Sequence, residues 1–275
     1  MRSLRALTLN IWHREAPWER RREIIRKGFA ELDPDFIGLQ EVLELDLGGN
    51  RTSQAQELIE GTPYQYVFGC AQMMMPGLEF GNAVLSKHPI LASETLRLPG
   101  EESGETRCVV YARLGTPFGE VPVFVTHLNW KLHQGSVRVR QVKRLVELIE
   151  ERAPVGKGFP PVLMGDFNAE PESDEIRWLR GHATLEGRSV YFADAWVYGG
   201  DGSPGYTFDR RNPYAARAHE PPRRLDYIFV RGPDSQWNGE PLSTRLVLDA
   251  PEEGVWASDH FGLLSEISAT RSRAP

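Results

Sequence analysis

Short polar strings beside hydrophobic runs constrain the fold of this 275-residue chain more than any other feature of its sequence. Most of the strings directly follow an apolar run, which is the pattern of a β-strand that ends at the rim of a sheet. Strand ends are where a rigid scaffold can aim side chains into a shared cleft. The strings carry acid, amide and imidazole groups and are Leu39-Gln40-Glu41, Thr126-His127-Leu128-Asn129, Gly165-Asp166-Phe167-Asn168, Leu225-Asp226-Tyr227 and Ser258-Asp259-His260.

The apolar pattern between the strings predicts an alternation of strands and helices. The helix at 134–152 is the clearest, because Val142, Leu145, Val146 and Ile149 recur at helical spacing. Residues 206–222 are rich in turn formers and are predicted to form a mobile or substrate-facing loop. Further helices are predicted from Pro17 onward, at 54–60 and at 172–180, and strands at 4–10, 36–41, 64–68, 82–86, 109–114, 121–128, 161–164, 225–230 and 262–267.

The alternation of side chains along the strand at 36–41 sets an expectation for Glu41. Every second residue falls on one side of a strand, so Glu41 ends a row begun by Ile37 and Leu39. We therefore expect this carboxylate to face the site rather than bulk water. The same alternation places His127 and Asn129 on one face.

Length and composition narrow the domain organisation and the compartment. We expect one domain at 1–270 and a C-terminal tail at 271–275, because two-sheet folds of this size can form a single unit. No stretch approaches the roughly 20 apolar residues of a membrane-spanning helix. The N-terminus lacks a signal-peptide cleavage site, and Cys70 and Cys108 are too few for a disulfide framework. These features predict a cytoplasmic protein without a transmembrane segment or an obligate protein partner.

The net charge bears on nucleic-acid binding. A formal charge of −6 weighs against a protein that grips duplex nucleic acid, which usually has a basic balance or a basic stripe. Basic clusters occur at 20–22, 138–144 and 210–224, but charge runs are more often solvated faces. The clusters weaken the charge argument without reversing it.

Each polar string taken alone is weak evidence of function. The Asp166 string is typical of a turn, and Ser258-Asp259-His260 is typical of a helix cap. Five unrelated turns would not be expected to combine carboxylates, amides and imidazoles without a lysine among them. A shared functional site is therefore the better interpretation.

Together with Leu-Thr-Leu-Asn10, the strings resemble those of the endonuclease/exonuclease/phosphatase superfamily of metal-dependent phosphoesterases. The resemblance covers nearly the whole chain and implies an α/β (α+β) fold. Its expected form is a four-layer α/β/β/α sandwich of two mainly antiparallel β-sheets flanked by helices, with the site at one edge of the sheets. The matching residues are the opening Asn10, the metal-binding Glu41, the central pair Asp166 and Asn168, the orienting Asp226, and the terminal dyad Asp259 and His260.

The chemistry of these residue types suits a divalent metal ion. Mg²⁺ prefers hard oxygen ligands, keeps several waters and is often held by one or two carboxylates together with substrate phosphate. Glu41 is the best direct ligand, with Asn10 beside it and Asp259 completing or bridging the site. The predicted cofactor is therefore Mg²⁺ or Mn²⁺.

The remaining residues of the strings are predicted to act on water and phosphate. Asp166 would orient or deprotonate the attacking water, while Asn168 and His127 donate hydrogen bonds to phosphoryl oxygens. The family resemblance pairs His260 with Asp226, and a carboxylate on one ring nitrogen fixes the tautomer and favours the charged imidazole.

Residues near the strings are predicted to contact substrate. They are Asn129, Trp130 and Arg107, although an ion pair is an equally good interpretation of Arg107. A run of methionines and two further tryptophans could either rim the cleft or pack in the core. The other histidines are expected on the surface or in loops. These groups are Met73-Met74-Met75, Trp12 and Trp256, and His13, His88, His133, His182 and His219.

The sequence thus predicts a divalent-metal-dependent phosphoesterase that hydrolyses a phosphodiester, or a phosphomonoester, by direct in-line attack of water. The alternatives are a DNA or RNA nuclease, a DNA-end-processing phosphodiesterase and a sphingomyelinase-like lipid phosphodiesterase. Thr126-His127-Leu128 resembles the sphingomyelinase, inositol phosphatase and tyrosyl-DNA phosphodiesterase branches more than the abasic-site endonucleases. A catalytically silent binding module is the least favoured reading, because Glu41 and His260 are both present.

Overall fold

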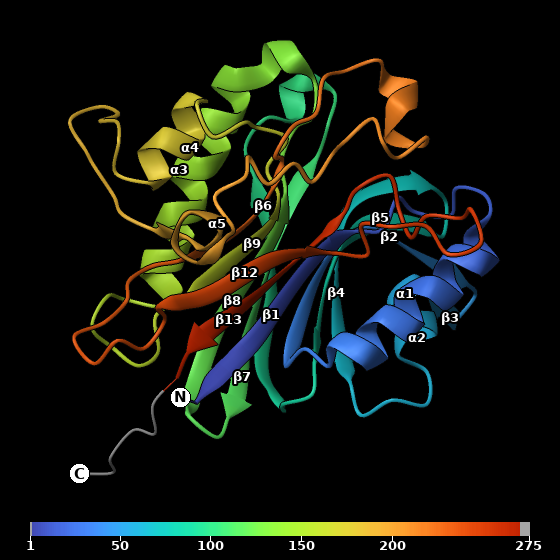
Figure 1. Ribbon diagram of the computed structural model, residues 1–275, viewed down its shortest axis with the longest axis horizontal. Coiled ribbons are helices and arrows are strands. Elements are labelled where there is room, and N and C mark those ends of the chain that lie inside the picture. Colours follow the sequence, from blue (N-terminus) through green and yellow to red (C-terminus); the bar gives the residue numbers. More distant parts are fainter. Residues whose placement is uncertain (1, 270–275) are drawn as a thin grey trace.

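The computed structural model describes residues 2–269, so the predicted tail at 271–275 lies outside the described residues. Two β-sheets pack face to face, and helices cover the outer face of each sheet (Figure 1). The predicted four-layer α/β/β/α sandwich is therefore confirmed. Within residues 2–269, every helix is too short or too polar to span a lipid bilayer.

The first sheet joins the two ends of the described chain. Strand β1 (Ser3–Asn10) lies at its centre, parallel to β2 and antiparallel to β13. The remaining pairs, including the β4–β5 hairpin, are antiparallel. Across the sheet the order is β12 (Pro241–Val247), β13 (Gly262–Ser268), β1, β2 (Phe36–Leu47), β5 (Leu78–Ser86) and β4 (Gln65–Met75), with β3 (Asn50–Ser53) paired to β2.

The second sheet is built from the middle of the chain. Only β8 and β9 run parallel among its described pairs, so both sheets are mainly antiparallel, as predicted. The order is β10 (Ala193–Asp194), β11 (Asp226–Val230), β9 (Val162–Asp166), β8 (Gly119–His127), β7 (Arg107–Thr116) and β6 (Ile90–Leu98).

Helices close the outer face of each sheet. Helices α1 (Trp18–Leu32) and α2 (Gln54–Ile59) pack on the first sheet, and α3 (Gly135–Arg152) and α4 (Asp174–Leu179) pack on the second. The apolar stripe predicted on α3 is buried, as its spacing required. The short helix α5 (Ala195–Gly199) contacts β12. A third apolar cluster fills the space between the two sheets.

Several strands differ from the sequence prediction. Strands β3, β6, β10 and β12 were not predicted, because each is short or weakly patterned and pairs with one neighbouring strand only. Strands β2, β4 and β5 are longer than predicted, since their ends form exposed hairpins beyond the core. The 206–222 segment is mostly loop, as predicted, with a short 3₁₀ helix at Ala215–Ala218.

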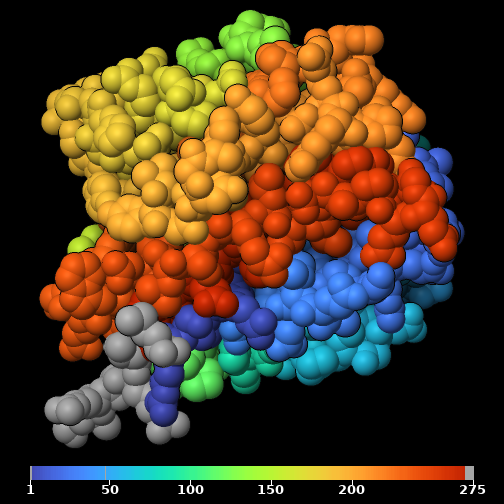
Figure 2. Space-filling view, in the orientation of Figure 1, coloured from blue at the N-terminus to red at the C-terminus, as the bar shows by residue number. Residues whose placement is uncertain are grey.

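The polar strings meet at one edge of the sandwich. Strands β1, β8 and β9 end there and β11 begins there, while residue 260 lies two positions before the start of β13. The start of β1 and the end of β13 lie at the opposite end of the sheets (Figure 1). Figure 2 shows the C-terminal segments, in red, running between the N-terminal part of the chain, in blue, and the residues around 200–220, in orange.

Candidate active site

Three residues of the second sheet form one row across the edge of the sandwich. His127 is paired with Asp166 in the β8–β9 register, and Asp166 is paired with Asp226 in the β9–β11 register. Asp226 begins its strand instead of ending it, but β11 runs antiparallel to β9 and so delivers the carboxylate to the same edge. Gly165 has a φ of +143°, and a Cβ there would lie 1.9 Å from the carbonyl oxygen of Thr126. The close approach of β8 and β9 therefore requires glycine before Asp166.

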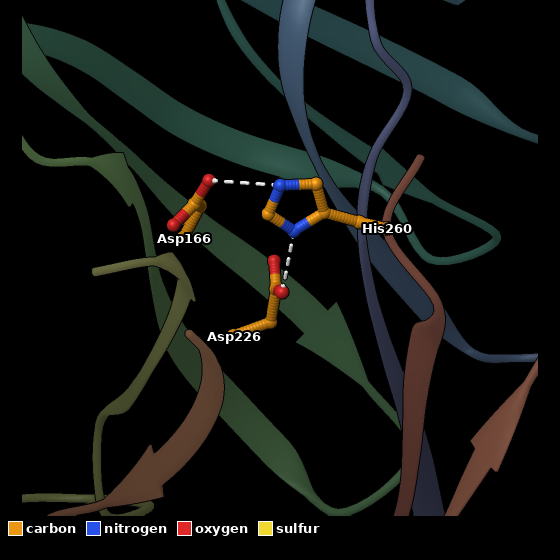
Figure 3. A group of neighbouring side chains, drawn as sticks. All are labelled: Asp166, Asp226 and His260. Atoms are coloured by element: carbon orange, nitrogen blue, oxygen red, sulfur yellow. Dashed lines mark hydrogen bonds and ion pairs between the residues drawn. The ribbon is translucent and has the colours of Figure 1, made fainter. Parts of the chain in front are cut away.

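His260 connects this row to the first sheet. Its Nδ1 lies 2.8 Å from Asp226 Oδ2, and its Nε2 lies 3.7 Å from Asp166 Oδ2. Figure 3 shows the imidazole ring between the two carboxylates. Although burial alone would lower the pKa of His260, the negative charges of Asp226 and Asp166 raise it well above its ordinary value. The ring is therefore an imidazolium at neutral pH.

Asp166 is the most connected carboxylate of the edge. Its Oδ2 accepts a hydrogen bond from Asn10 Nδ2 at 3.1 Å, and its Oδ1 accepts one from the backbone N–H of Asn168 at 2.9 Å. The His127 Nε2 atom also lies 3.5 Å from Asp166 Oδ2. Groups from both sheets thus converge on this one buried carboxylate.

Asn168 and His127 contact each other directly. Asn168 Nδ2 lies 3.0 Å from His127 Nε2 and also donates to the Leu128 carbonyl oxygen at 3.1 Å. An amide proton facing Nε2 makes that nitrogen an acceptor, which places the His127 proton on Nδ1. Burial and then the charge of Arg107 lower the pKa of His127 to about 3, so this ring is neutral. Donation from His127 Nε2 to a phosphate would require this bond to break.

Glu41 reaches the site for a reason other than the predicted one. Ile37 and Leu39 point into the core beneath α1 and α2, so simple alternation would send Glu41 away from the other sheet. The β2–β5 register shifts between Leu39 and Val42, and Glu41 has a φ of +58°. This β-bulge turns the carboxylate toward Asn10, whose Nδ2 donates to Glu41 Oε1 at 3.2 Å. The expected location is correct, but the row argument behind it was wrong.

The carboxylates of Glu41 and Asp259 fit a divalent cation. Burial raises the pKa of Glu41, and burial raises the pKa of Asp259 to about 6, with the charge of Glu41 adding to the rise. Two neighbouring, partly exposed carboxylates whose ionisation is disfavoured would be stabilised by a shared cation. Asn10 turns its NH₂ group toward Glu41 and Asp166, while its Oδ1 accepts the Trp12 N–H at 3.0 Å. In this arrangement Asn10 orients the carboxylates.

A second group of potential ligands needs a different interpretation. Asp166, Asp226 and His260 have ligand atoms within 4.8 Å of one another. Both ring nitrogens of His260 face carboxylate oxygens, Nδ1 toward Asp226 at 2.8 Å and Nε2 toward Asp166 at 3.7 Å, and this ion-paired arrangement favours a protonated ring over a metal ligand. We therefore interpret this group as one that holds a proton.

The three residues predicted to bind substrate have different environments. Arg107 is buried and donates to Glu105 Oε2 at 2.8 Å, so the ion-pair interpretation is confirmed for this state of the protein. Trp130 is 56% exposed. Asn129 is fully buried, and its side chain bonds to Ser103, Gln134 and Gln141. Asn129 thus supports the loops around the site and has no surface open to a ligand.

The structure adds two residues that sequence reasoning did not assign to the site. His13, which was expected to be a surface or loop histidine, lies in the loop after β1, and its Nε2 is 3.9 Å from Glu41 Oε2. Phe208, from the 206–222 loop, packs on His260 with ring centroids 5.0 Å apart. The only sequence signal for His13 is its position three residues after Asn10. Among the remaining candidates, Met73-Met74-Met75 is exposed and Trp256 is buried.

Comparison with known proteins identifies the family. The family model described as Endonuclease/Exonuclease/phosphatase family matches residues 7–260. The chain therefore belongs to the endonuclease/exonuclease/phosphatase family, a class of hydrolases that act on phosphoester bonds. The resemblance inferred from the polar strings is confirmed.

One curated relative and several solved structures are similar to the chain. The chain is 27% identical over 190 residues to Protein angel of Drosophila melanogaster. The matched region covers 64% of this chain and 50% of that protein. The chain thus spans about half the length of this curated relative.

The solved structures share the fold at low sequence identity. A D. rerio TDP2 humanized by 14 mutations has a TM-score of 0.73 at 18% identity, covering 97% of this chain and 99% of that chain. The human Nocturnin catalytic domain with bound sulfate has a TM-score of 0.72 at 21% identity, covering 98% and 94%. D. rerio TDP2 complexed with a single-strand DNA product has a TM-score of 0.73 at 18% identity, covering 98% and 100%.

Proposed function

We propose that this protein is a divalent-metal-dependent phosphodiesterase that hydrolyses its substrate by direct in-line attack of water. The observation that carries the proposal is the convergence on Asp166. This carboxylate is held by amide groups from both sheets and lies between an imidazolium and a neutral imidazole. Such a group can hold and orient a water molecule without itself becoming a nucleophile.

Glu41 and Asp259 would hold the metal ion, with Asn10 orienting Glu41. Mg²⁺ is the proposed ion and Mn²⁺ the expected substitute, because the available donors are carboxylate oxygens without a thiolate. When bound, the ion would polarise a phosphoryl oxygen and stabilise charge as the P–O bond breaks. The raised pKa values of the two carboxylates support this assignment, since a cation would relieve their mutual repulsion.

Asp166 is the proposed residue that accepts the proton of the attacking water. Its two oxygens are fixed by Asn10 and by the Asn168 backbone, so the carboxylate cannot rotate away from the attack direction. The imidazolium of His260 would then donate to a phosphoryl oxygen as negative charge develops there. Asp226 keeps that imidazole charged through its bond to Nδ1.

The other predicted site residues have supporting roles in this proposal. Asn168 would bind phosphate with its NH₂ group once the bond to His127 is exchanged for one to substrate. Arg107 contributes positive charge near Glu41 and His127 while it remains paired with Glu105. The exposed Trp130 offers an apolar contact for the substrate.

The compartment is also a proposal. Cys70 and Cys108 are both free thiols, which supports a reducing environment such as the cytoplasm. Cell fractionation tests this location directly.

Hydrolysis of a generic diester tests the proposed reaction. Bis-p-nitrophenyl phosphate should be cleaved in Mg²⁺ or Mn²⁺, and EDTA should abolish turnover. A chiral phosphorothioate diester cleaved in ¹⁸O-labelled water should invert its configuration at phosphorus, because one in-line displacement inverts and two displacements retain. Retention would refute direct attack of water, and metal-independent turnover would refute the metal requirement. Failure of the purified protein to cleave any diester with either metal would favour the silent binding module.

A further inference from the structure

His13 presents a ring nitrogen to the candidate metal ligand Glu41 without bonding to it. The Nε2 atom of His13 lies 3.9 Å from Glu41 Oε2, which is too long for a hydrogen bond. Within residues 2–269 neither atom forms a hydrogen bond elsewhere, because the amide of Asn10 donates to the other oxygen of Glu41, Oε1. The His13 side chain is 34% exposed, so an ion can reach it from solvent. Two potential ligand atoms therefore face each other at the candidate metal pocket.

The separation of these two atoms fits two ligands of one metal ion. Bonds from a divalent ion to nitrogen or oxygen are about 2.1 Å long, so two ligand atoms of one ion can lie up to about 4.2 Å apart. The 3.9 Å between His13 Nε2 and Glu41 Oε2 falls within this limit. A direct ion pair would instead bring the nitrogen and the oxygen to about 2.8 Å. The geometry thus favours a shared ion over an ion pair.

The backbone around His13 is held in this position by the fold. His13 has a φ of +29°, a left-handed conformation that is costly for a residue with a Cβ and persists only where the surroundings hold it. Arg21 donates to the carbonyl oxygen of His13 at 2.9 Å and to that of Ala257 at 3.1 Å. Ala257 lies two residues before Asp259, so one guanidinium joins the His13 loop to the loop that carries the second candidate carboxylate. The position of His13 beside the metal pocket therefore does not depend on an ion.

The two other imidazoles of the site have different partners. The Nε2 atom of His127 accepts a hydrogen bond from Asn168. Both ring nitrogens of His260 face carboxylate oxygens, as described above. Among the imidazoles that the structure places at this edge, His13 is the one whose Nε2 faces a candidate metal ligand and forms no hydrogen bond.

We propose that His13 is a nitrogen ligand that joins Glu41 when the site binds a transition-metal ion such as Mn²⁺ or Co²⁺. Imidazole is a good ligand of first-row transition metals, and affinity rises from Mn²⁺ to Co²⁺. Mg²⁺ prefers oxygen ligands and keeps its waters, so Glu41 and Asp259 hold it without His13. This inference rests on the proposed function, and it adds to that metal site a further ligand and a reason to discriminate between metals.

Titration with the metal ions alone tests the proposal. Co²⁺ and Mg²⁺ are titrated calorimetrically into the wild-type protein and into His13→Asn, whose asparagine tolerates the left-handed backbone. The variant should bind Co²⁺ at least about 10-fold more weakly, while its affinity for Mg²⁺ should stay within about twofold of wild type. His219→Asn is the matched control, because His219 is an exposed loop histidine that also has a positive φ, at +59°. The control should bind both ions as wild type does.

Pulsed electron paramagnetic resonance of bound Mn²⁺ detects the nitrogen directly. Modulation from an imidazole nitrogen should be present in wild type and in His219→Asn, and it should be lost in His13→Asn. The proposal is wrong if the modulation persists in His13→Asn, if wild type binds Mn²⁺ without it, or if the affinity for Mg²⁺ falls as far as that for Co²⁺. These results would leave the proposed metal site intact. If wild type binds none of the three ions, the metal site of the proposed function is refuted and His13 as its ligand with it, so the two failures are distinguishable.

Discussion

Replacing Arg21 should destabilise the protein and weaken its affinity for metal. Arg21 belongs to α1, is 0% exposed and donates six hydrogen bonds to five carbonyl oxygens. Four of these carbonyls lie in the loop that follows Asn10, and the fifth is that of Ala257, two residues before Asp259. Burial lowers the pKa of Arg21 to about 10, so the group remains charged at neutral pH. One cation thus fixes two loops that carry residues of the candidate metal pocket.

The expected cost follows from the number of carbonyls. A buried acceptor that loses its donor costs about 1 kcal/mol at the low end of the usual range, so Arg21→Met should cost about 5 kcal/mol. Lysine has only three N–H donors and leaves two of the five carbonyls without one, so Arg21→Lys should cost about 2 kcal/mol. Arg20→Met is the control, because Arg20 forms exposed ion pairs with Glu23 and Glu253 that are worth little.

Urea unfolding and Mn²⁺ titration measure the two effects separately. Unfolding should order the proteins as wild type and Arg20→Met, then Arg21→Lys, then Arg21→Met. Calorimetric titration of the folded Arg21→Lys protein should give a Mn²⁺ affinity about 10-fold below that of wild type, because the loops no longer hold Asn10 and Asp259 in place. If Arg21→Met unfolds within about 1 kcal/mol of Arg20→Met, or if Arg21→Lys binds Mn²⁺ as wild type does, the reasoning is refuted.

Two further substitutions test the roles of single carboxylates. Glu41→Gln should raise the Mg²⁺ concentration needed for half-maximal hydrolysis, because an amide oxygen is a poorer ligand than a carboxylate, and an unchanged metal requirement would exclude Glu41 as a ligand. Asp226→Asn removes the carboxylate that most raises the pKa of His260, so the fall in kcat at alkaline pH should move to lower pH. The raised pKa of His260 also stabilises the fold below its unfolded value of about 6.5, and this contribution is lost as the pH rises through the folded value. The stability lost in Asp226→Asn should therefore be largest at acidic pH and smallest at alkaline pH, and a pH-independent loss measured by urea unfolding would contradict the pairing.

The spacing of apolar residues predicted those helices and strands that bury a regular set of side chains. The α3 stripe and the central strands β1, β8 and β9 were located correctly, because their apolar residues recur at the spacing of the element. Strand β6 was missed since its residues Ser93, Glu94 and Thr95 are polar and its partner covers only one side. Edge strands such as β6 pair with one neighbour only and bury few of their side chains, so they lack the apolar pattern by which a strand is predicted.

The polar strings located most of the candidate site for a similar reason. A side chain at the terminus of a central strand projects into the shared edge of the sheet. The strand boundaries alone therefore predict that His127, Asp166 and Asp226 lie together. Asn129 lies past the end of β8, where alternation no longer applies, and its side chain turns into the loop network. Strand patterns therefore predict side-chain direction only as far as the strand itself extends.

The remaining site geometry depends on backbone conformations that a residue pattern does not encode. Trp12, His13, Glu41 and Asn168 all have positive φ, at +52°, +29°, +58° and +48°, although none is glycine. Such conformations are costly for residues with a Cβ and persist only where the surroundings hold them. The Trp12 and His13 carbonyls are held by Arg21, while Glu41 is held by Asn10, which is 31 residues away in the chain. The strained positions and the residues that hold them are joined only in the folded state, so Arg21 and the Glu41 bulge could be found only from the structure.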